Sequence, residues 1–268
     1  MRNLVYQYWD GPIPQGVEYN IDLVKDWAER IGAEYRFDHN TKFFTGIGKA
    51  SHFYGTLKPV YDDSFLEYDN VLYLDCDVFP IKDESPFENL QQYDIAMAKE
   101  LFQPKQRKKF NTGICSKQDE IWATVIKKNW RLHTLPKCKD GLEIFNAGVV
   151  LYSNKGLKIA REKFIPIIEY INIIKKNKIH DFYTHDQNYL HANVFGGIGL
   201  LYCFLDKKWN SIIHPYWIDS AKTKLDINDE RTDDTVLVHI QLKKADYFSD
   251  DLLHSICHDP IEVWRNKI

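Results

Sequence analysis

Asp75 and Asp77 form an Asp-x-Asp motif that follows the apolar run VLYL and precedes a second apolar run, VFP. On a continuing strand, residues i and i+2 point to one face, so the two carboxylates would lie side by side. A divalent cation offsets their repulsion, and Mg²⁺ or Mn²⁺ takes carboxylate oxygens while keeping positions open for phosphates. The alternative is a strand that runs into a turn, where aspartates bond to backbone groups. Apolar residues on both sides of the pair favour the metal site.

His239 lies near the end of a second apolar segment, TVLVHI at 235–240. If this segment is a strand, alternation places His239 on the face opposite Val238 and Ile240. An imidazole is a borderline nitrogen ligand for divalent metals. A histidine in such a place is otherwise a core residue, so the segment alone leaves both interpretations open.

A strand–helix–strand order at the N-terminus predicts how these side chains are positioned. Residues 3–9 form a strand that ends at Asp-Gly-Pro, apolar residues then recur at helical spacing up to Gly32, and 33–37 form a second strand. This order is typical of a parallel sheet with crossover helices. Further strands are predicted at 70–81, 144–153 and 235–240. Because ligands of open α/β sheets bind beyond the carboxyl ends of the strands, the acidic pair and His239 lie where a site is expected.

Two further helices are predicted in the middle of the chain. One covers 51–58 and ends before Pro59, since the residue before a proline disfavours helix. The other follows the strand at 144–153 as one long helix with an apolar face formed by Ala160, Phe164, Ile167, Ile171 and Ile174. The basic run KQRKK at 105–109 is predicted to be a solvated loop, with a lid facing the acceptor or anionic lipid as the second interpretation.

Composition excludes several classes of protein. The chain has 268 residues, 44% of them hydrophobic, and a formal net charge of −3, so we expect one globular domain without the basic face of a nucleic-acid binder. Its longest nearly apolar run, VFGGIGLLYCFL, has 12 residues, and a membrane-spanning helix needs about 20. The N-terminus lacks the apolar stretch of a secretory signal, and the 5 cysteines form no C-x-x-C pair. These features predict a cytoplasmic protein; they leave peripheral membrane contact and the oligomeric state open.

Four motifs resemble, in their order, those of the GT-A glycosyltransferases, most closely family 8, which includes glycogenin, galactinol synthase and bacterial lipopolysaccharide galactosyl- and glucosyltransferases. The motifs are YDNVLYLDCDVFP, FNAGVVLYSN, HDQNYLHANVF with LDKKWNS downstream, and VLVHI. The resemblance implies an α/β fold: a single GT-A (Rossmann-like nucleotide-diphospho-sugar transferase) domain with a mixed, mostly parallel central sheet flanked by helices. Residues 1 to about 110 would bind the nucleotide, and about 111–268 the donor sugar and acceptor.

The resemblance also implies roles for individual residues. Asp75, Asp77 and His239 would hold Mn²⁺ or Mg²⁺, and Asp186 and Gln187 would be catalytic. The nucleotide would contact Tyr8, Trp9, Lys58, Cys76 and Lys243, and the donor sugar or acceptor would contact Asn146, Ala147 and Gly148.

Other interpretations of these residues stay open. Asn146 and Gly148 would otherwise belong to a bulge, Asp186 would be a helix N-cap, Lys58 a surface lysine, and the aromatic residues of the first strand core. The chain departs from the family by Asn188 and by QLKKADYF after Ile240, which lacks the usual glycine, proline and tryptophan. Whether Lys243 or Lys244 faces the diphosphate is therefore open.

The predicted reaction is transfer of a hexose from a nucleotide-diphosphate sugar, UDP-glucose or UDP-galactose, to a hydroxyl of a glycan or glycoconjugate. The resemblance implies retention of anomeric configuration. Because the resemblance also implies that Gln187 is the residue nearest the anomeric carbon, we favour same-face displacement over a carboxylate nucleophile. One alternative is a sugar-nucleotide-forming nucleotidyltransferase, although its Gly-rich phosphate loop is missing from the first turn, DGPIPQG. The other is a non-catalytic nucleotide- or glycan-binding relic of the fold.

Overall fold

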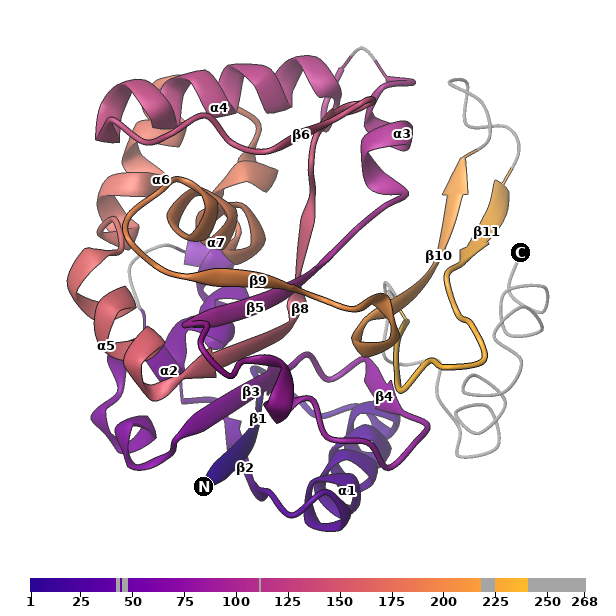
Figure 1. The fold of residues 1–268 in the computed structure, drawn as a ribbon. Helices are drawn as coiled ribbons and strands as arrows, with labels where there is room; N and C mark the ends of the chain where they lie inside the picture. Colours follow the sequence, from indigo (N-terminus) through magenta and orange to yellow (C-terminus); the bar gives the residue numbers. More distant parts are fainter. Residues whose placement is uncertain (42–43, 45–47, 111, 218–224, 241–268) are drawn as a thin grey trace.

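A six-stranded sheet forms the centre of the computed structural model, which describes residues 1–41, 44, 48–110, 112–217 and 225–240 (Figure 1). Its strand order is β2-β1-β3-β8-β5-β9. β8 runs antiparallel to its neighbours β3 and β5, whereas the other pairs are parallel, so the sheet is mixed and mostly parallel as predicted. The strands are β1 (Asn3–Trp9), β2 (Glu34–His39), β3 (Asn70–Leu74), β5 (Ile95–Lys99), β8 (Phe145–Ser153) and β9 (Tyr202–Leu205).

A second, four-stranded sheet has the order β11-β10-β12-β4 and was not foreseen from the sequence. Its strands are β4 (Val78–Pro80), β10 (Ser211–Trp217), β11 (Leu225–Asp229) and β12 (Leu237–Ile240). The chain passes from the first sheet to the second between β3 and β4, at the Asp-x-Asp motif. A short hairpin of β6 (Lys137–Cys138) and β7 (Gly141–Leu142) lies apart from both sheets.

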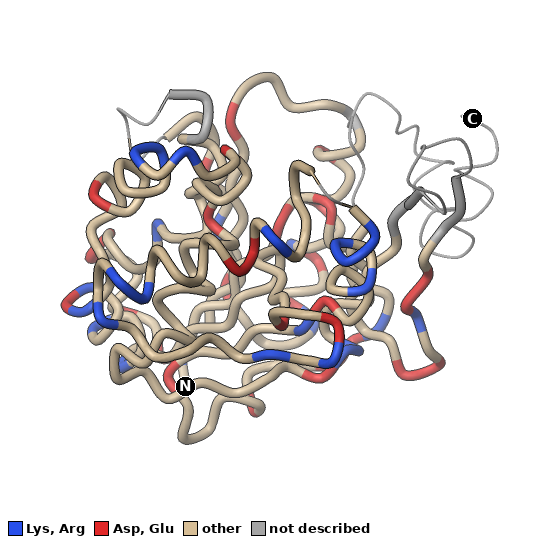
Figure 2. The backbone as a smooth tube through the Cα atoms, turned by 90° about the horizontal axis from the view of Figure 1, so that it is seen from above, with Lys and Arg blue, Asp and Glu red and all other residues tan. Residues whose placement is uncertain are grey.

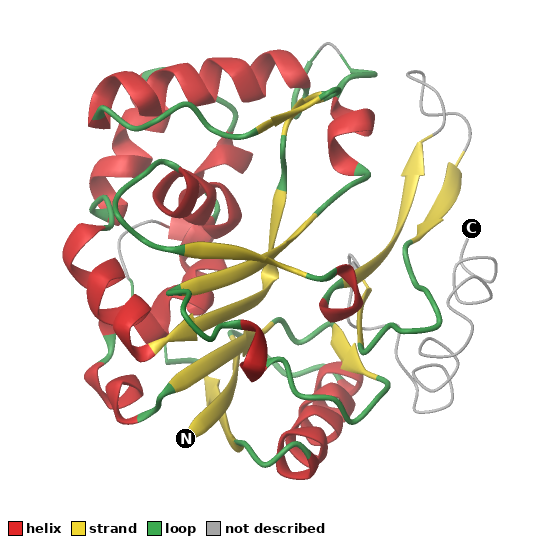
Figure 3. Ribbon diagram, viewed as in Figure 1, coloured by secondary structure: helices red, strands yellow, loops and turns green. Residues whose placement is uncertain are grey.

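Helices cover both faces of the central sheet (Figure 3). On one face, α1 (Gln15–Arg30) packs Val24 and Trp27 against Val5 and Leu72. On the other face, Tyr6 and Tyr8 join a larger apolar core with α4 to α7, as strand alternation predicts. The α-helices there are α2 (Lys58–Tyr61), α3 (Gln103–Arg107), α4 (Ser116–Trp130), α5 (Asn154–Lys163), α6 (Ile167–Lys176) and α7 (Asp186–Phe195). Short 3₁₀ helices are η1 (Gly48–Leu57), η2 (Asp63–Glu67), η3 (Phe87–Asn89), η4 (Asp181–Thr184) and η5 (Lys207–Trp209).

Both helices predicted in the middle of the chain need correction at a proline. The helix expected through Ala160 and Ile174 is two helices, α5 and α6: the backbone is already extended at Phe164, and Pro166, which has no N–H and disfavours helix at the residue before it, is the N-cap of α6. Its apolar residues are nevertheless all buried. Pro59 does not end a helix either: it lies in the first turn of α2, where a missing N–H costs nothing.

The basic run at 105–109 is not the solvated loop that we predicted. Its first half forms the end of α3, and Arg107 is buried, with 4% of its surface exposed. The Arg107 guanidinium donates to Asp119 of α4 at 2.7 Å, and Tyr183 donates to the same carboxylate oxygen at 2.7 Å. A buried charge needs such a partner, so this run anchors α3 to the domain.

Charges of both signs are interspersed along the backbone (Figure 2), in keeping with the formal net charge of −3. In the described part of the chain, no helix has both the length and the apolar character needed to cross a membrane.

His191 of α7 gives the core a pH-dependent stability. Its ring lies 5.1 Å from that of Phe145 and 5.3 Å from that of Trp122, and its Nε2 has no hydrogen-bond partner. Burial, with Arg107 nearby, lowers the pKa of His191 to about 3. Between this value and about 6.5 the unfolded chain binds a proton that the folded protein excludes, so stability is lost as pH falls below about 6.5.

Replacing His191 by phenylalanine should remove this dependence. Urea unfolding between pH 6 and pH 4 should show a loss of unfolding free energy that is smaller by roughly 1.4 kcal/mol per pH unit in His191→Phe than in the wild type. The exposed His133 provides the control, and His133→Phe should follow the wild-type curve. Parallel curves for His191→Phe and the wild type would contradict the explanation.

Candidate functional site

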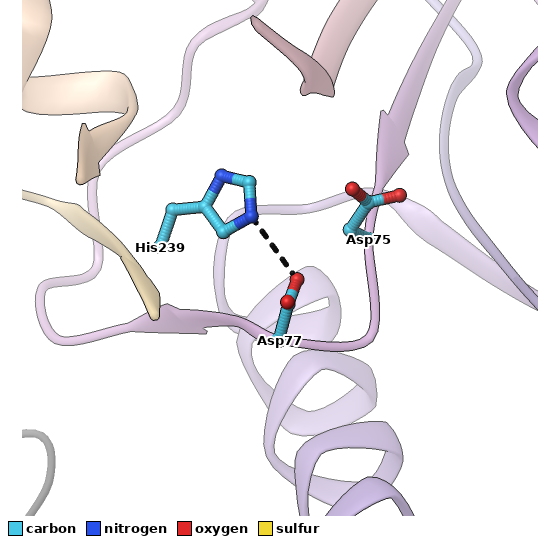
Figure 4. Close-up of side chains that lie close together, drawn as sticks. All are labelled: Asp75, Asp77 and His239. Atoms are coloured by element: carbon cyan, nitrogen blue, oxygen red, sulfur yellow. Dashed lines mark ion pairs between the residues drawn. The ribbon is translucent and has the colours of Figure 1, made fainter. Parts of the chain in front are cut away.

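Asp75, Asp77 and His239 converge at the junction of the two sheets (Figure 4). One ligand atom from each lies within 4.8 Å of the others, and His239 Nε2 lies 3.1 Å from Asp77 Oδ1. Asp77 Oδ1 is buried and accepts no hydrogen bond. Two carboxylates and an imidazole are a ligand set that fits a divalent cation such as Mn²⁺, and one of the carboxylate oxygens, Asp77 Oδ1, lacks a hydrogen-bond partner.

The two carboxylates come together by a turn, which corrects the continuing strand that we predicted. β3 ends at Leu74, and the Val78 N–H donates to the Asp75 carbonyl at 3.1 Å. The Asp75 N–H in turn donates to the Gly148 carbonyl of β8 at 2.8 Å, which fixes the start of the turn to the central sheet. Tyr73 donates to Asp75 Oδ1 at 2.7 Å.

His239 reaches the acidic pair because β12 pairs with β4. His239 lies opposite Val78 in this antiparallel pair, and the Ile240 N–H donates to the Asp77 carbonyl at 3.0 Å. The predicted strand is therefore present, although it begins at Leu237. Only 3% of the surface of His239 is exposed, so the residue is buried as a core histidine would be. It also lies beside Asp75 and Asp77, as a metal ligand would.

The electrostatics of the site favour a bound cation. Burial and the Asp77 carboxylate raise the pKa of Asp75 to about 6. Burial alone lowers the pKa of His239, but Asp77 and Asp75 outweigh it and raise that pKa. Burial and the same two carboxylates hold the pKa of the Cys76 thiol well above its usual range. Protons therefore compete with a cation for Asp75 and His239, and metal affinity should fall as pH falls.

A cavity of about 610 Å³ opens above these residues. It brings together most of the residues predicted from the sequence, which come from the ends of β1, β3 and β8, from the start of α7 and from β12. The predicted residues that line it are Tyr8, Trp9, Asp75, Cys76, Asp77, Asn146, Ala147, Gly148, Asp186, Gln187 and His239.

One predicted residue, Lys58, does not line this cavity. Lys58 is buried and is held by Asp38, with a second hydrogen bond to Thr41 at 2.9 Å. It is neither a surface lysine nor part of the cavity lining. Lys243, like Lys244, lies outside the described residues.

Asp186 is the first residue of α7, and the N-cap is His185. Burial, with a contribution from Asp75, raises the pKa of Asp186 well above its usual range. The N-cap interpretation is therefore wrong by one position, and the carboxyl group faces the cavity next to Gln187.

Sequence reasoning missed an aromatic wall of the cavity. The rings of His52 and Phe53 lie 3.9 Å apart, those of Phe53 and His185 lie 4.0 Å apart, and Phe182 adjoins His185. η1 and η4 supply this wall, and no pattern in the sequence indicated that the two segments meet.

The fold matches solved structures of glycosyltransferases. WbbM, a bifunctional glycosyltransferase, aligns with a TM-score of 0.50 and 14% identity over 79% of this chain and 40% of that chain. A glycosyltransferase involved in the glycosylation of the major capsid of PBCV-1 aligns with a TM-score of 0.49 and 14% identity over 91% of this chain and 95% of that one. The galactosyltransferase LgtC, solved in complex with donor and acceptor sugar analogs, gives 0.47 and 17% identity over 99% and 100%. No protein-family model and no curated protein matches the chain. The likeness to WbbM shows that the chain has the α/β fold of this glycosyltransferase.

Proposed function

We propose that the protein is a metal-dependent hexosyltransferase of the family 8 type. It would move a hexose, with retention, from a nucleotide-diphosphate sugar such as UDP-glucose or UDP-galactose to a hydroxyl of a glycan or glycoconjugate. The observation that supports this most directly is the convergence of Asp75, Asp77 and His239 in the cavity, on a glycosyltransferase fold.

The metal would be Mn²⁺ or Mg²⁺, held by Asp75, Asp77 and His239. When bound, it supplies a Lewis acid that offsets the charge developing on the departing diphosphate. A lysine at 243 or 244 would add a fixed cation, and the role of Lys58 would be indirect, through Asp38.

The remaining residues that line the cavity would each contact a different part of the donor. Tyr8 and Trp9 end β1, and one of these two aromatic residues would stack on the base, while the backbone at Cys76 would approach the nucleotide. Asn146, Ala147 and Gly148 would contact the donor sugar. In this division residues 1 to about 110 hold the nucleotide and the rest of the chain holds the sugar and acceptor.

Asp186 and Gln187 would act at the reacting carbon. The raised pKa of Asp186 makes this group a poor nucleophile but a good hydrogen-bond donor, suited to orienting a sugar hydroxyl. The Gln187 amide is a weak nucleophile, so same-face displacement is the mechanism that this arrangement favours.

Slow hydrolysis of the donor tests the proposal without knowledge of the acceptor. With Mn²⁺, the purified protein should release UDP from UDP-glucose or UDP-galactose, and chelation by EDTA should stop the release. A coupled assay for UDP measures this. Formation of a sugar nucleotide from UTP and a hexose 1-phosphate would instead identify a nucleotidyltransferase, and donor binding with no product in either assay would identify a relic.

A further inference from the structure

A row of buried side-chain hydrogen bonds lies behind His239, on the side away from Asp77. His239 Nδ1 lies 3.0 Å from Asn210 Oδ1, and Asn210 Nδ2 donates to Asn146 Oδ1 at 2.9 Å. The fraction of surface exposed is 0% for Asn210 and 3% each for Asn146 and His239. With no water to exchange partners, each of these groups depends on the next.

The Gly148 N–H, at the end of the row away from His239, decides which atom donates and which accepts in every hydrogen bond of the row. The Gly148 N–H can only donate, and it donates to Asn146 Oδ1 at 2.8 Å. The Asn146 amide nitrogen therefore faces the other way, where it donates to Glu100 Oε1 at 2.6 Å. Asn146 Oδ1 also accepts from Asn210 Nδ2, so the oxygen of Asn210 must face the imidazole.

Because an amide oxygen can only accept, the hydrogen bond to Asn210 requires a proton on His239 Nδ1. Nε2, which lies 3.1 Å from Asp77 Oδ1, is then the nitrogen whose lone pair is left for a cation. Backbone pairing fixes the geometry, since Asn210 directly precedes β10, and Ile212 of β10 lies beside His239 of β12.

We propose that Asn210 is the positioning residue for metal binding: it holds the Nδ1 proton and the ring plane of His239, and so presents Nε2 to the cation. This inference rests on the proposed function, which supplies the cation. Outer partners of metal-bound histidines change metal affinity by about 10–100-fold when they are removed.

The test measures Mn²⁺ binding directly, by the EPR signal of free Mn²⁺ with and without UDP. Asn210→Ala should raise the Kd for Mn²⁺ about 10–100-fold. It should also weaken the ¹⁴N coupling that pulsed EPR detects from the His239 nitrogen on bound Mn²⁺. Asn210→Asp keeps an acceptor for Nδ1 although it loses the donor to Asn146, so it should keep the ¹⁴N coupling and bind Mn²⁺ more tightly than Asn210→Ala does.

Asn193 provides a matched control, because it is also 0% exposed and also makes two hydrogen bonds, from Ile165 N–H and to the Tyr189 carbonyl, both 2.8 Å long. Asn193→Ala should lower the melting temperature and leave the Kd for Mn²⁺ unchanged. Equal Kd values for Asn210→Ala and the wild type, or equal rises in Asn210→Ala and Asn193→Ala, would overturn the proposal. If Asn210→Ala does not fold, Asn210→Ser replaces it, since a hydroxyl on Cβ falls short of Nδ1. Absence of Mn²⁺ binding by the wild type would count against the proposed function instead.

Discussion

Replacing Asp77 by alanine should lower kcat/KM for sugar transfer, or for donor hydrolysis, by at least about 10²–10³-fold, the usual loss when one stabiliser of developing charge is removed. Asp77 supplies the carboxylate that lies beside His239 Nε2, and its buried Oδ1 has no hydrogen-bond partner to compensate. The loss should be largest at limiting Mn²⁺. Initial rates over a range of Mn²⁺ concentrations measure both effects.

Two nearby acidic residues serve as controls for the Asp77 variant. Asp83 pairs with Arg30 and Glu84 pairs with Lys208, both at the surface and outside the cavity. Their alanine variants should keep wild-type rates and Mn²⁺ dependence, because surface ion pairs contribute little to stability. An Asp77→Ala enzyme with the same rates and Mn²⁺ dependence as these controls would remove the Asp-x-Asp motif from the mechanism.

Adding one methyl group at Gly148 should strongly lower metal-dependent activity in a protein that still folds. A Cβ there would lie 2.3 Å from His239 Cε1 and 2.8 Å from Asp75 Oδ2. Both are side-chain atoms, so the fold can survive by moving the ligands apart, which destroys the site. We expect Gly148→Ala to lose about 10²-fold or more in kcat/KM, as for a misplaced reacting group, and to bind Mn²⁺ weakly by EPR.

A variant at Gly156 serves as the control that distinguishes loss of metal binding from loss of folding. A Cβ at Gly156 would lie 1.9 Å from the backbone carbonyl oxygen of Asp94, far from the cavity lining. Backbone cannot move aside as a side chain can, so Gly156→Ala should be poorly folded, with a lowered melting temperature. If Gly148→Ala is instead the less stable of the two and keeps its Mn²⁺ affinity for as long as it is folded, the packing argument is wrong.

Local patterns were enough to predict four strands of the central sheet, β1, β2, β3 and β8, but not β5 and β9. β1 matches its predicted range, and β8 and β12 lie within theirs, because apolar runs and turn residues are signals that neighbouring residues supply. Pro166 is also a local signal for the break between α5 and α6, but the apolar residues keep helical spacing across it and so favour one helix. The second sheet was not predictable in this way, since the pairing of β4 with β12 joins distant parts of the chain.

In the site, too, some features follow from the local sequence and others depend on the pairing of distant segments. Motif order indicated Asp75, Asp77 and His239, but the turn that brings the carboxylates together depends on the bond from Asp75 to Gly148 in another strand. Asn210 lay in a noted motif, LDKKWNS, yet its bond to His239 follows only from the pairing of β10 with β12. The ring contact between Phe53 and His185 likewise depends on tertiary packing.

The pairing of β4 with β12 also joins two parts of the proposed metal site that are synthesised at different times. Among the described residues, β4 has no strand partner other than β12. Translation adds about 5–20 residues per second, so roughly ten seconds or more separate the emergence of Asp77 from that of His239. During that interval the nascent chain gains Gly148, to which the acidic turn is bonded, but has no imidazole opposite the turn. Until His239 has emerged, the polypeptide lacks one of the three residues that we propose hold the cation, and the strand that supplies it is the last one in the described part of the chain.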